Sequence, residues 1–171
     1  MGGFECSTHR LESGRRLDML AATGHDRHFR RDYERMRAIG IATARTGIRW
    51  HLIEQRPGEY EWSSVLPMLR AAREMGIQLV WDVCHYGYPD DLDIFSPEFV
   101  RRFRRLSKAF ARLLNNETDD PPIISPVNEI SFFSWAAGES AHLNPYAVGR
   151  GFELKVQLVR AALECVDAFW E

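Results

Sequence analysis

Residues suited to binding or acid–base chemistry lie at or just after short apolar segments at three places in this 171-residue sequence. They are Arg45, Trp50, His85, Tyr86, Asn128, Glu129 and Trp135. A glutamate can give or take a proton during a reaction, and arginine, asparagine and histidine supply directed hydrogen bonds. Tyrosine and tryptophan add flat apolar faces with a polar edge. Sugars present both C–H faces and hydroxyl groups, so this combination predicts a carbohydrate-binding site.

The local sequence gives no sign of a metal site, a bound cofactor or a disulfide framework. No two of the six histidines have the i, i+4 spacing of a helical zinc motif. Cys6, Cys84 and Cys165 are odd in number and far apart. No predicted strand is followed by a glycine-rich phosphate loop. We therefore expect no metal, no cofactor and a cytoplasmic chain with reduced thiols.

The composition argues against two further classes of protein. The formal charge of −2 gives no support to nucleic-acid binding. No apolar run approaches the roughly 20 residues that a membrane span needs. With 45% hydrophobic and 12% aromatic residues, the chain has enough apolar side chains to form a packed core.

The elements that must position these residues alternate along the chain. Short apolar segments, typical of strands, alternate with segments whose apolar residues recur every three or four positions, typical of helices. The predicted strands cover residues 4–7, 43–50, 78–83 and 123–127, and the predicted helices cover 26–39, 63–75, 96–114 and a last segment from 144 almost to the end. The residues predicted to face inward on the last helix are Phe152, Val156, Val159, Leu163 and Val166.

Four successive strand–helix units predict a parallel α/β sheet. Such a sheet is either open and doubly wound or part of an eight-stranded barrel, and the missing phosphate loop favours the barrel. In a parallel barrel the active site forms at the carboxyl ends of the strands, where the polar and aromatic residues are found.

Segments at the predicted strand ends resemble those of a known enzyme family. Residues 45–50 read R-T-G-I-R-W, residues 85–89 read H-Y-G-Y-P and residues 126–129 read P-V-N-E. In order, they resemble the R-F-S-I-S-W, H-W-D-L-P and N-E-P segments of family 1 of the clan A retaining glycoside hydrolases, the β-glucosidase and β-galactosidase group. Residues 57–62 also resemble the P-x-G-x-Y-x-W/F segment of the clan.

The resemblance implies a role for each matching residue. Glu129 corresponds to the general acid/base, and Asn128 to the residue that binds the sugar 2-hydroxyl. Arg45 corresponds to the arginine that keeps the nucleophile ionised, and His85 to a histidine that binds a sugar hydroxyl. The other implied substrate-binding residues are Tyr86, Trp50 and Trp135, the last as a wall for the aglycone. Packing inside the barrel is the alternative role for Trp50.

The resemblance covers the first half of a (βα)8 TIM barrel. A full barrel takes about 250 residues, so we expect residues 1–171 to form the N-terminal half of a single barrel. The nucleophile of the clan, a glutamate at the end of the seventh strand, has no counterpart in these residues, and the chain alone is expected to be inactive. Its sheet edges are expected to bind a C-terminal half barrel or to self-associate.

Three alternatives to this interpretation remain. Tyr86-Gly87 stands where family 1 has W-D, and Ile130 where it has Pro, so a clan A glycosidase outside family 1 also fits. A non-catalytic sugar-binding or scaffolding half barrel would need no nucleophile. An Asn-Glu pair after a strand can also serve only to cap the next helix.

Overall fold

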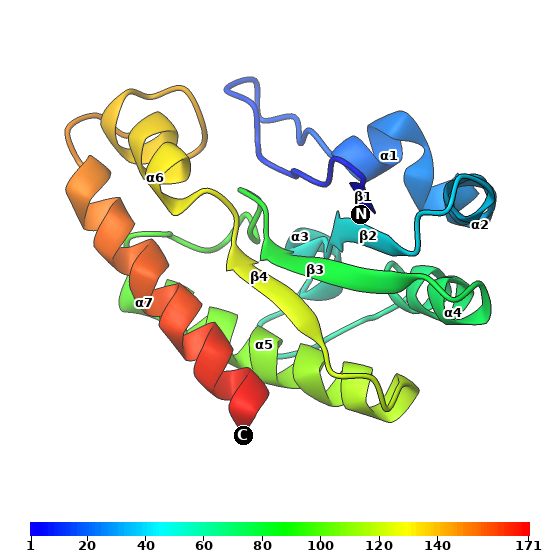
Figure 1. Ribbon diagram of the computed structural model, residues 1–171. Helices are drawn as coiled ribbons and strands as arrows, with labels where there is room; N and C mark the ends of the chain where they lie inside the picture. Colours follow the sequence, from blue (N-terminus) through cyan, green and yellow to red (C-terminus); the bar gives the residue numbers. More distant parts are fainter.

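The computed structural model describes residues 1–171 and contains one parallel sheet whose strands lie in chain order (Figure 1). The strands are β1 (Gly2–Gly3), β2 (Thr43–Gly47), β3 (Gln78–Cys84) and β4 (Ile123–Val127). Each strand pairs only with its neighbours in the chain, which leaves β1 and β4 as edges. The fold is therefore an α/β half barrel: the alternation of elements predicted the parallel sheet, and the family resemblance predicted the half barrel.

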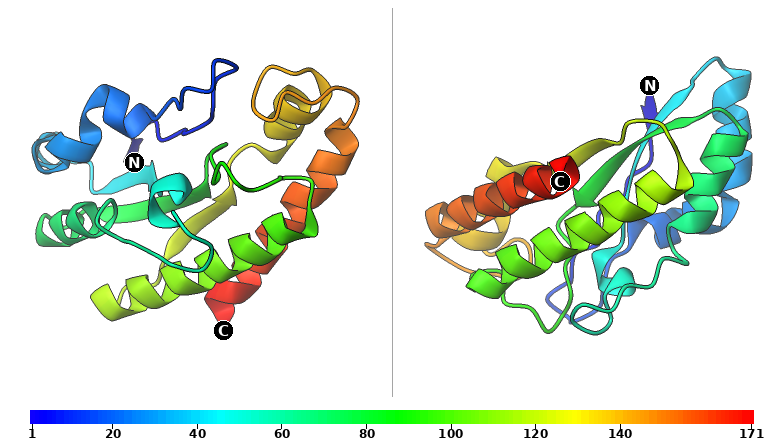
Figure 2. Two further views of the ribbon diagram at one scale, coloured as in Figure 1. Left: turned by 180° about the vertical axis from the view of Figure 1, so that it is seen from behind. Right: turned by 90° about the horizontal axis from the view of Figure 1, so that it is seen from below.

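Helices follow each strand. They are α1 (Met19–Thr23), α2 (His25–Ala38), α3 (Trp50–Ile53), α4 (Leu66–Glu74), α5 (Pro97–Glu117), α6 (Ile130–Phe133), the π-helical turn η1 (Ser134–Glu139) and α7 (Gly151–Trp170). The two longest helices, α5 and α7, pack side by side, and α7 also packs against β4 (Figures 1 and 2). None of the helices is both long and apolar enough to cross a membrane.

The periodicity of the sequence predicted the central elements correctly. β3 and β4 match their predicted ranges to within one residue, and α2 and α5 begin within one residue of their predicted starts. On α5, Phe99, Phe103, Leu106 and Phe110 are fully buried, as their spacing indicated. They pack in one hydrophobic core with Trp81 of β3.

The first strand lies nearer the N-terminus than the predicted residues 4–7. Gly2 and Gly3 are the residues that pair with β2, and only the Phe4 N–H extends the ladder, donating to the Arg45 carbonyl at 2.8 Å. A Cβ at Gly2 would lie 2.8 Å from the terminal methyl of the flexible Met36 side chain, which would have to move. Glycine has low strand propensity, which is why the sequence pattern did not indicate this pair.

Two other elements are shorter than predicted, and several short helices were not predicted. β2 ends at Gly47 instead of residue 50, because α3 begins at Trp50. α4 begins at Leu66 instead of residue 63, since the Ser63 hydroxyl bonds to Glu61 and caps no helix. The unpredicted helices are α1, α3, α6 and η1.

The last helix begins later than predicted. α7 starts at Gly151, whereas the prediction placed its start at residue 144. Residues 140–150 form a loop that folds back on η1, and the Ala147 N–H donates to the Ala137 carbonyl at 2.9 Å. These backbone bonds to η1 replace the bonds that a longer helix would make.

The predicted inward face of α7 is also wrong. Its buried residues are Leu154, Gln157, Leu158, Ala161, Cys165 and Ala168. The predicted stripe instead faces outward, with Phe152 82% and Leu163 62% exposed. We define the α7 stripe as Phe152, Val156, Val159, Leu163, Val166 and Trp170. The helix thus has two apolar faces, and only one of them packs on the rest of the chain.

Candidate active site

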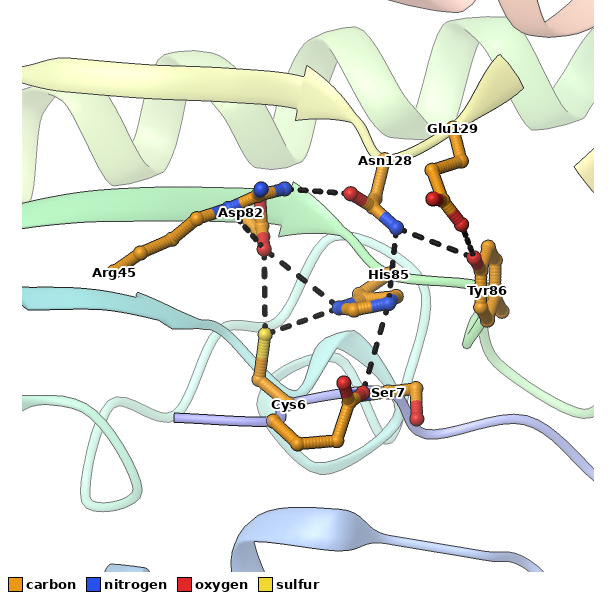
Figure 3. A network of polar contacts seen from close by, with 9 residues as sticks. Cys6, Ser7, Arg45, Asp82, His85, Tyr86, Asn128 and Glu129 are labelled. Carbon is orange, nitrogen blue, oxygen red and sulfur yellow. Dashed lines mark hydrogen bonds and ion pairs between the residues drawn. The ribbon is translucent and has the colours of Figure 1, made fainter. Parts of the chain in front are cut away.

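Polar residues from three strands converge where β2, β3 and β4 end (Figure 3). The parallel register aligns the carboxyl ends of these strands at one edge of the sheet. The residues that meet there, which we call the rim cluster, are Arg45, Asp82, His85, Tyr86, Asn128 and Glu129. The cluster therefore occupies the edge at which parallel barrels form their active sites.

A buried carboxylate holds Arg45 in place. Arg45 Nε lies 3.1 and 3.0 Å from Asp82 Oδ1 and Oδ2, and Nη2 lies 2.7 Å from Oδ1. Nη2 also donates to Asn128 Oδ1 at 2.5 Å. Hydrogen bonding to Asp82 raises the pKa of Arg45 against the opposing effect of partial burial. The guanidinium is thus a fixed positive group that joins β2 to the residue after β4.

The contact with Arg45 determines which way the Asn128 amide faces. A guanidinium only donates hydrogen bonds, so Asn128 presents Oδ1 to Arg45 and Nδ2 to the other side. Nδ2 lies 3.0 Å from His85 Nε2 and 3.2 Å from the Tyr86 hydroxyl. His85 Nε2 must then accept, which puts the proton of the neutral imidazole on Nδ1. Burial lowers the pKa of His85 and favours this neutral form.

Glu129 is an exposed carboxylate held by Tyr86. The Tyr86 hydroxyl donates to Glu129 Oε2, and burial together with this contact raises the pKa of Tyr86. Both residues have a positive φ, 65° for Tyr86 and 47° for Glu129, a strained conformation found at functional sites. Glu129 precedes α6, but its side chain caps no backbone N–H. Helix capping therefore does not explain this glutamate.

The glycine at position 87, where the W-D segment has aspartate, has a steric cause. The segment after β3 crosses the segment after β1, where the Thr8 N–H donates to the His85 carbonyl at 3.1 Å. A Cβ at Gly87 would lie 1.9 Å from Thr8 Oγ1 and 2.3 Å from Thr8 O. An aspartate at this position would displace the segment that follows β1.

Asp82 belongs to the rim cluster, and Cys6 and Glu5 contact it, although the sequence analysis gave none of these three residues a role in the site. Cys6 Sγ lies 3.4 Å from Asp82 Oδ2 and 3.2 Å from His85 Nδ1, and Glu5 Oε1 lies 3.7 Å from His85 Nε2. Asp82 interrupts the apolar run of β3, and a charge in a buried strand requires a partner. The sequence could therefore have indicated that Asp82 forms an ion pair. Burial and the nearby Asp82 raise the pKa of the Cys6 thiol, which makes it a poor nucleophile.

Trp135 belongs to an aromatic surface next to the rim cluster. It is 49% exposed, and its ring stacks on His142 with centroids 5.3 Å apart. The centroid of the Phe132 ring lies 5.9 Å from that of Trp135 and 5.9 Å from that of Tyr86. An exposed ring in this position can stack on the apolar face of a sugar or an aglycone.

Trp50 lies in the core, which contradicts its predicted role in substrate binding. It is 1% exposed, and its ring packs on Phe99 and Phe103. Its indole N–H donates to Glu54 Oε2 at 2.6 Å. A buried ring whose N–H is already paired has no free face for a sugar.

The fold and the rim cluster define an α/β half barrel with acid, amide, imidazole and aromatic groups at the carboxyl ends of its strands. No family model and no curated protein matches the sequence. Among solved structures, the family 1 β-glucosidase from Thermotoga maritima in complex with isofagomine lactam matches with a TM-score of 0.76 and 17% identity, over 85% of this chain and 35% of that chain.

Two further solved structures give the same result. The AHE enzyme from Alicyclobacillus herbarius matches with a TM-score of 0.76 and 18% identity, over 85% of this chain and 34% of that chain. The β-glycosidase from Pyrococcus horikoshii matches with a TM-score of 0.73 and 15% identity, over 84% of this chain and 35% of that chain. The chain thus spans about a third of the length of these structures. The matches confirm the predicted fold, that of the N-terminal part of a TIM-barrel glycosidase.

Proposed function

We propose that residues 1–171 form the N-terminal half of one glycoside hydrolase barrel and carry the acid/base half of its active site. The observation that carries this proposal is the hydrogen-bonded rim cluster, in which Arg45 contacts Asn128, Asn128 contacts His85 and Tyr86, and Tyr86 contacts Glu129. A carboxylate close to groups that bind hydroxyls is one half of what glycoside hydrolysis requires, because the reaction uses two carboxylates. The similarity in fold to β-glucosidases supports the same function.

In the proposed retaining mechanism, Glu129 acts twice. As an acid, it protonates the glycosidic oxygen while a second carboxylate attacks the sugar. As a base, it then deprotonates the water that releases the sugar from that carboxylate. The two carboxylates must lie about 5–5.5 Å apart, so the second half of the barrel has to bring its nucleophile close to Glu129. The Tyr86 hydroxyl keeps the Glu129 side chain at the rim.

The neighbouring side chains are proposed to bind the sugar. Asn128 binds the 2-hydroxyl and His85 a second hydroxyl. Arg45 is already bonded to Asp82, so we propose that it orients the Asn128 amide and that its charge helps to keep the nucleophile ionised. Trp135 is proposed to stack on the aglycone.

We propose that the completed barrel acts on a β-glucoside and serves carbohydrate metabolism. Support comes from the matching structures, which include a β-glucosidase in complex with isofagomine lactam and with methoxycarbonyl-substituted glucoimidazole. A cytoplasmic location is proposed because Cys6, Cys84 and Cys165 are all free thiols.

We propose that a C-terminal half barrel covers the two surfaces that lie at the end of the sheet. β4 has an edge without a neighbouring strand, and the α7 stripe next to it is apolar and exposed. Unpaired strand backbone and exposed apolar patches both favour association. We call the protein that contains both half barrels, with these two surfaces covered, the completed barrel.

Without that partner, residues 1–171 are expected to self-associate through the same surfaces. Leu163→Gln in the α7 stripe is expected to weaken the association at least about tenfold, since burial of a leucine contributes about 1.5–3 kcal/mol. Lys155→Gln, at an exposed polar position of the same helix, is the matched control. Sedimentation velocity over a concentration series measures the effect. A monomeric wild type at every concentration, or equal effects of the two substitutions, would contradict this expectation.

Hydrolysis of an aryl β-glucoside tests the proposed function. The 171-residue chain alone is expected to give no turnover, because it has no counterpart of the strand-seven nucleophile. The completed barrel is expected to give turnover with retention of the anomeric configuration. Turnover by the chain alone, or inversion by the completed barrel, would contradict the proposal. Sugar binding without turnover by the completed barrel would favour the non-catalytic alternative.

A further inference from the structure

Three side chains that can ligate a metal come together beside the active-site residues (Figure 3). Cys6 follows β1, Asp82 lies in β3 and His85 follows β3 directly. We propose that Cys6, Asp82 and His85 form a binding site for a zinc-type divalent cation. The proposal does not depend on glycosidase activity. The local sequence gave no sign of this site because Cys6 lies 76 and 79 positions from the other two residues.

The three donor atoms lie close to the spacing of tetrahedral ligands. Cys6 Sγ is 3.4 Å from Asp82 Oδ2 and 3.2 Å from His85 Nδ1, and these last two atoms are 3.6 Å apart. Bonds of about 2.3 Å to sulfur and about 2.0–2.2 Å to nitrogen and oxygen give tetrahedral edges of about 3.3–3.6 Å. Only small side-chain shifts are needed to place one ion between the three atoms.

Packing around the site holds the thiol against the other two donor atoms. Cys6 packs over Gly47, where a Cβ would lie 2.8 Å from the sulfur, so the glycine leaves room for this thiol next to Asp82. The 3.6 Å between Asp82 Oδ2 and His85 Nδ1 is too long for a hydrogen bond. The same distance suits two ligands of one ion.

The surrounding residues balance the charges and protons that binding requires. Cys6 releases its thiol proton to solvent, so that its thiolate and the Asp82 carboxylate neutralise the divalent ion. The His85 proton moves from Nδ1 to Nε2, which ends the hydrogen bond that Nε2 accepts from Asn128 Nδ2. Glu5 Oε1, now 3.7 Å from Nε2, must move closer to accept this proton. Arg45 Nη2 stays on Asp82 Oδ1 at 2.7 Å while Oδ2 binds the ion. A carboxylate behind the histidine and a donor behind the carboxylate are the usual outer partners of metal ligands.

Cobalt(II) is a spectroscopic probe for this site. Cobalt(II) is added to the chelator-treated 171-residue chain, and the absorption spectrum is recorded. We expect one equivalent to produce the intense visible bands of tetrahedral cobalt and the near-ultraviolet band of a cobalt–thiolate bond. Excess zinc(II) is expected to abolish both bands. A wild-type spectrum without the thiolate band would overturn the proposal.

Variants then identify the ligands. Cys6→Ser is expected to abolish the thiolate band, and His85→Gln to weaken cobalt binding at least about tenfold, because even outer partners contribute 10–100-fold. Cys165→Ser, a buried cysteine on α7 away from the site, is the matched control and keeps the band. Circular dichroism checks that each variant is folded. If Cys6→Ser does not fold, the cobalt affinity of His85→Gln tests the assignment. Loss of the band in Cys165→Ser, or unchanged affinity in His85→Gln, would contradict the assignment.

Discussion

Replacing Arg45 by methionine is expected to lower the free energy of unfolding by about 3 kcal/mol, because it leaves the Asp82 carboxylate buried without its partner. The Asp82 side chain is 2% exposed, and the substitution removes all three guanidinium contacts with it. The Arg45 side chain is 39% exposed, so solvent screening places the loss at the low end of the range of about 3–5 kcal/mol for buried pairs. Urea unfolding at neutral pH measures this difference.

Asp82→Asn is the matched variant for the same ion pair, and we expect it to cost only about 1 kcal/mol. In that variant Arg45 keeps its bond to Asn128 and can reach water, so no charge is left buried. The double variant Arg45→Met/Asp82→Asn is expected to be more stable than Arg45→Met alone, because the uncompensated carboxylate is gone. A loss in Asp82→Asn as large as that in Arg45→Met would show that the buried charge is not the cause.

Much of the fold could be predicted from the sequence because the burial of each strand and helix is written in the pattern of its own apolar residues. β3 is largely buried and is apolar apart from Gln78 and Asp82, while α5 buries a single stripe spaced three or four residues apart. The site was predictable for a related reason. Strands that run parallel bring their carboxyl ends to one edge, so residues following different strands, such as His85 and Asn128, could be expected to meet.

Features that depend on register or on missing neighbours could not be predicted in the same way. The contacts of Cys6 with Asp82 and His85 exist only because β1, β2 and β3 pair in one particular register. On α7, a period of 3.6 residues indicates an apolar face but does not say which of two such faces packs inward. The larger residues of the α7 stripe suggested the wrong one. The buried face holds smaller residues such as Ala161 and Cys165 that fit closely against the chain.

In the completed barrel, Glu129→Gln is expected to reduce kcat for an alkyl β-glucoside by about 10²–10⁴-fold, the usual contribution of general acid–base catalysis. Glutamine keeps the shape of the side chain and can still accept a hydrogen bond from Tyr86. It can neither protonate the glycosidic oxygen nor deprotonate water. With an aryl β-glucoside that has a good leaving group, the first step needs little acid assistance. The loss then falls on the second step, and steady-state and burst kinetics should detect an accumulating glycosyl-enzyme.

Glu139→Gln is the control, because this glutamate also follows β4 but has a structural contact. Glu139 Oε2 accepts from the Gly151 N–H at 3.0 Å, where α7 begins, so its substitution should leave kcat within a few-fold of wild type at unchanged fold. Azide, a nucleophile that needs no base, is expected to restore turnover of the aryl substrate by Glu129→Gln and to yield a glycosyl azide. Equal losses in the two variants, or equal losses on alkyl and aryl substrates, would mean that Glu129 transfers no proton in either step.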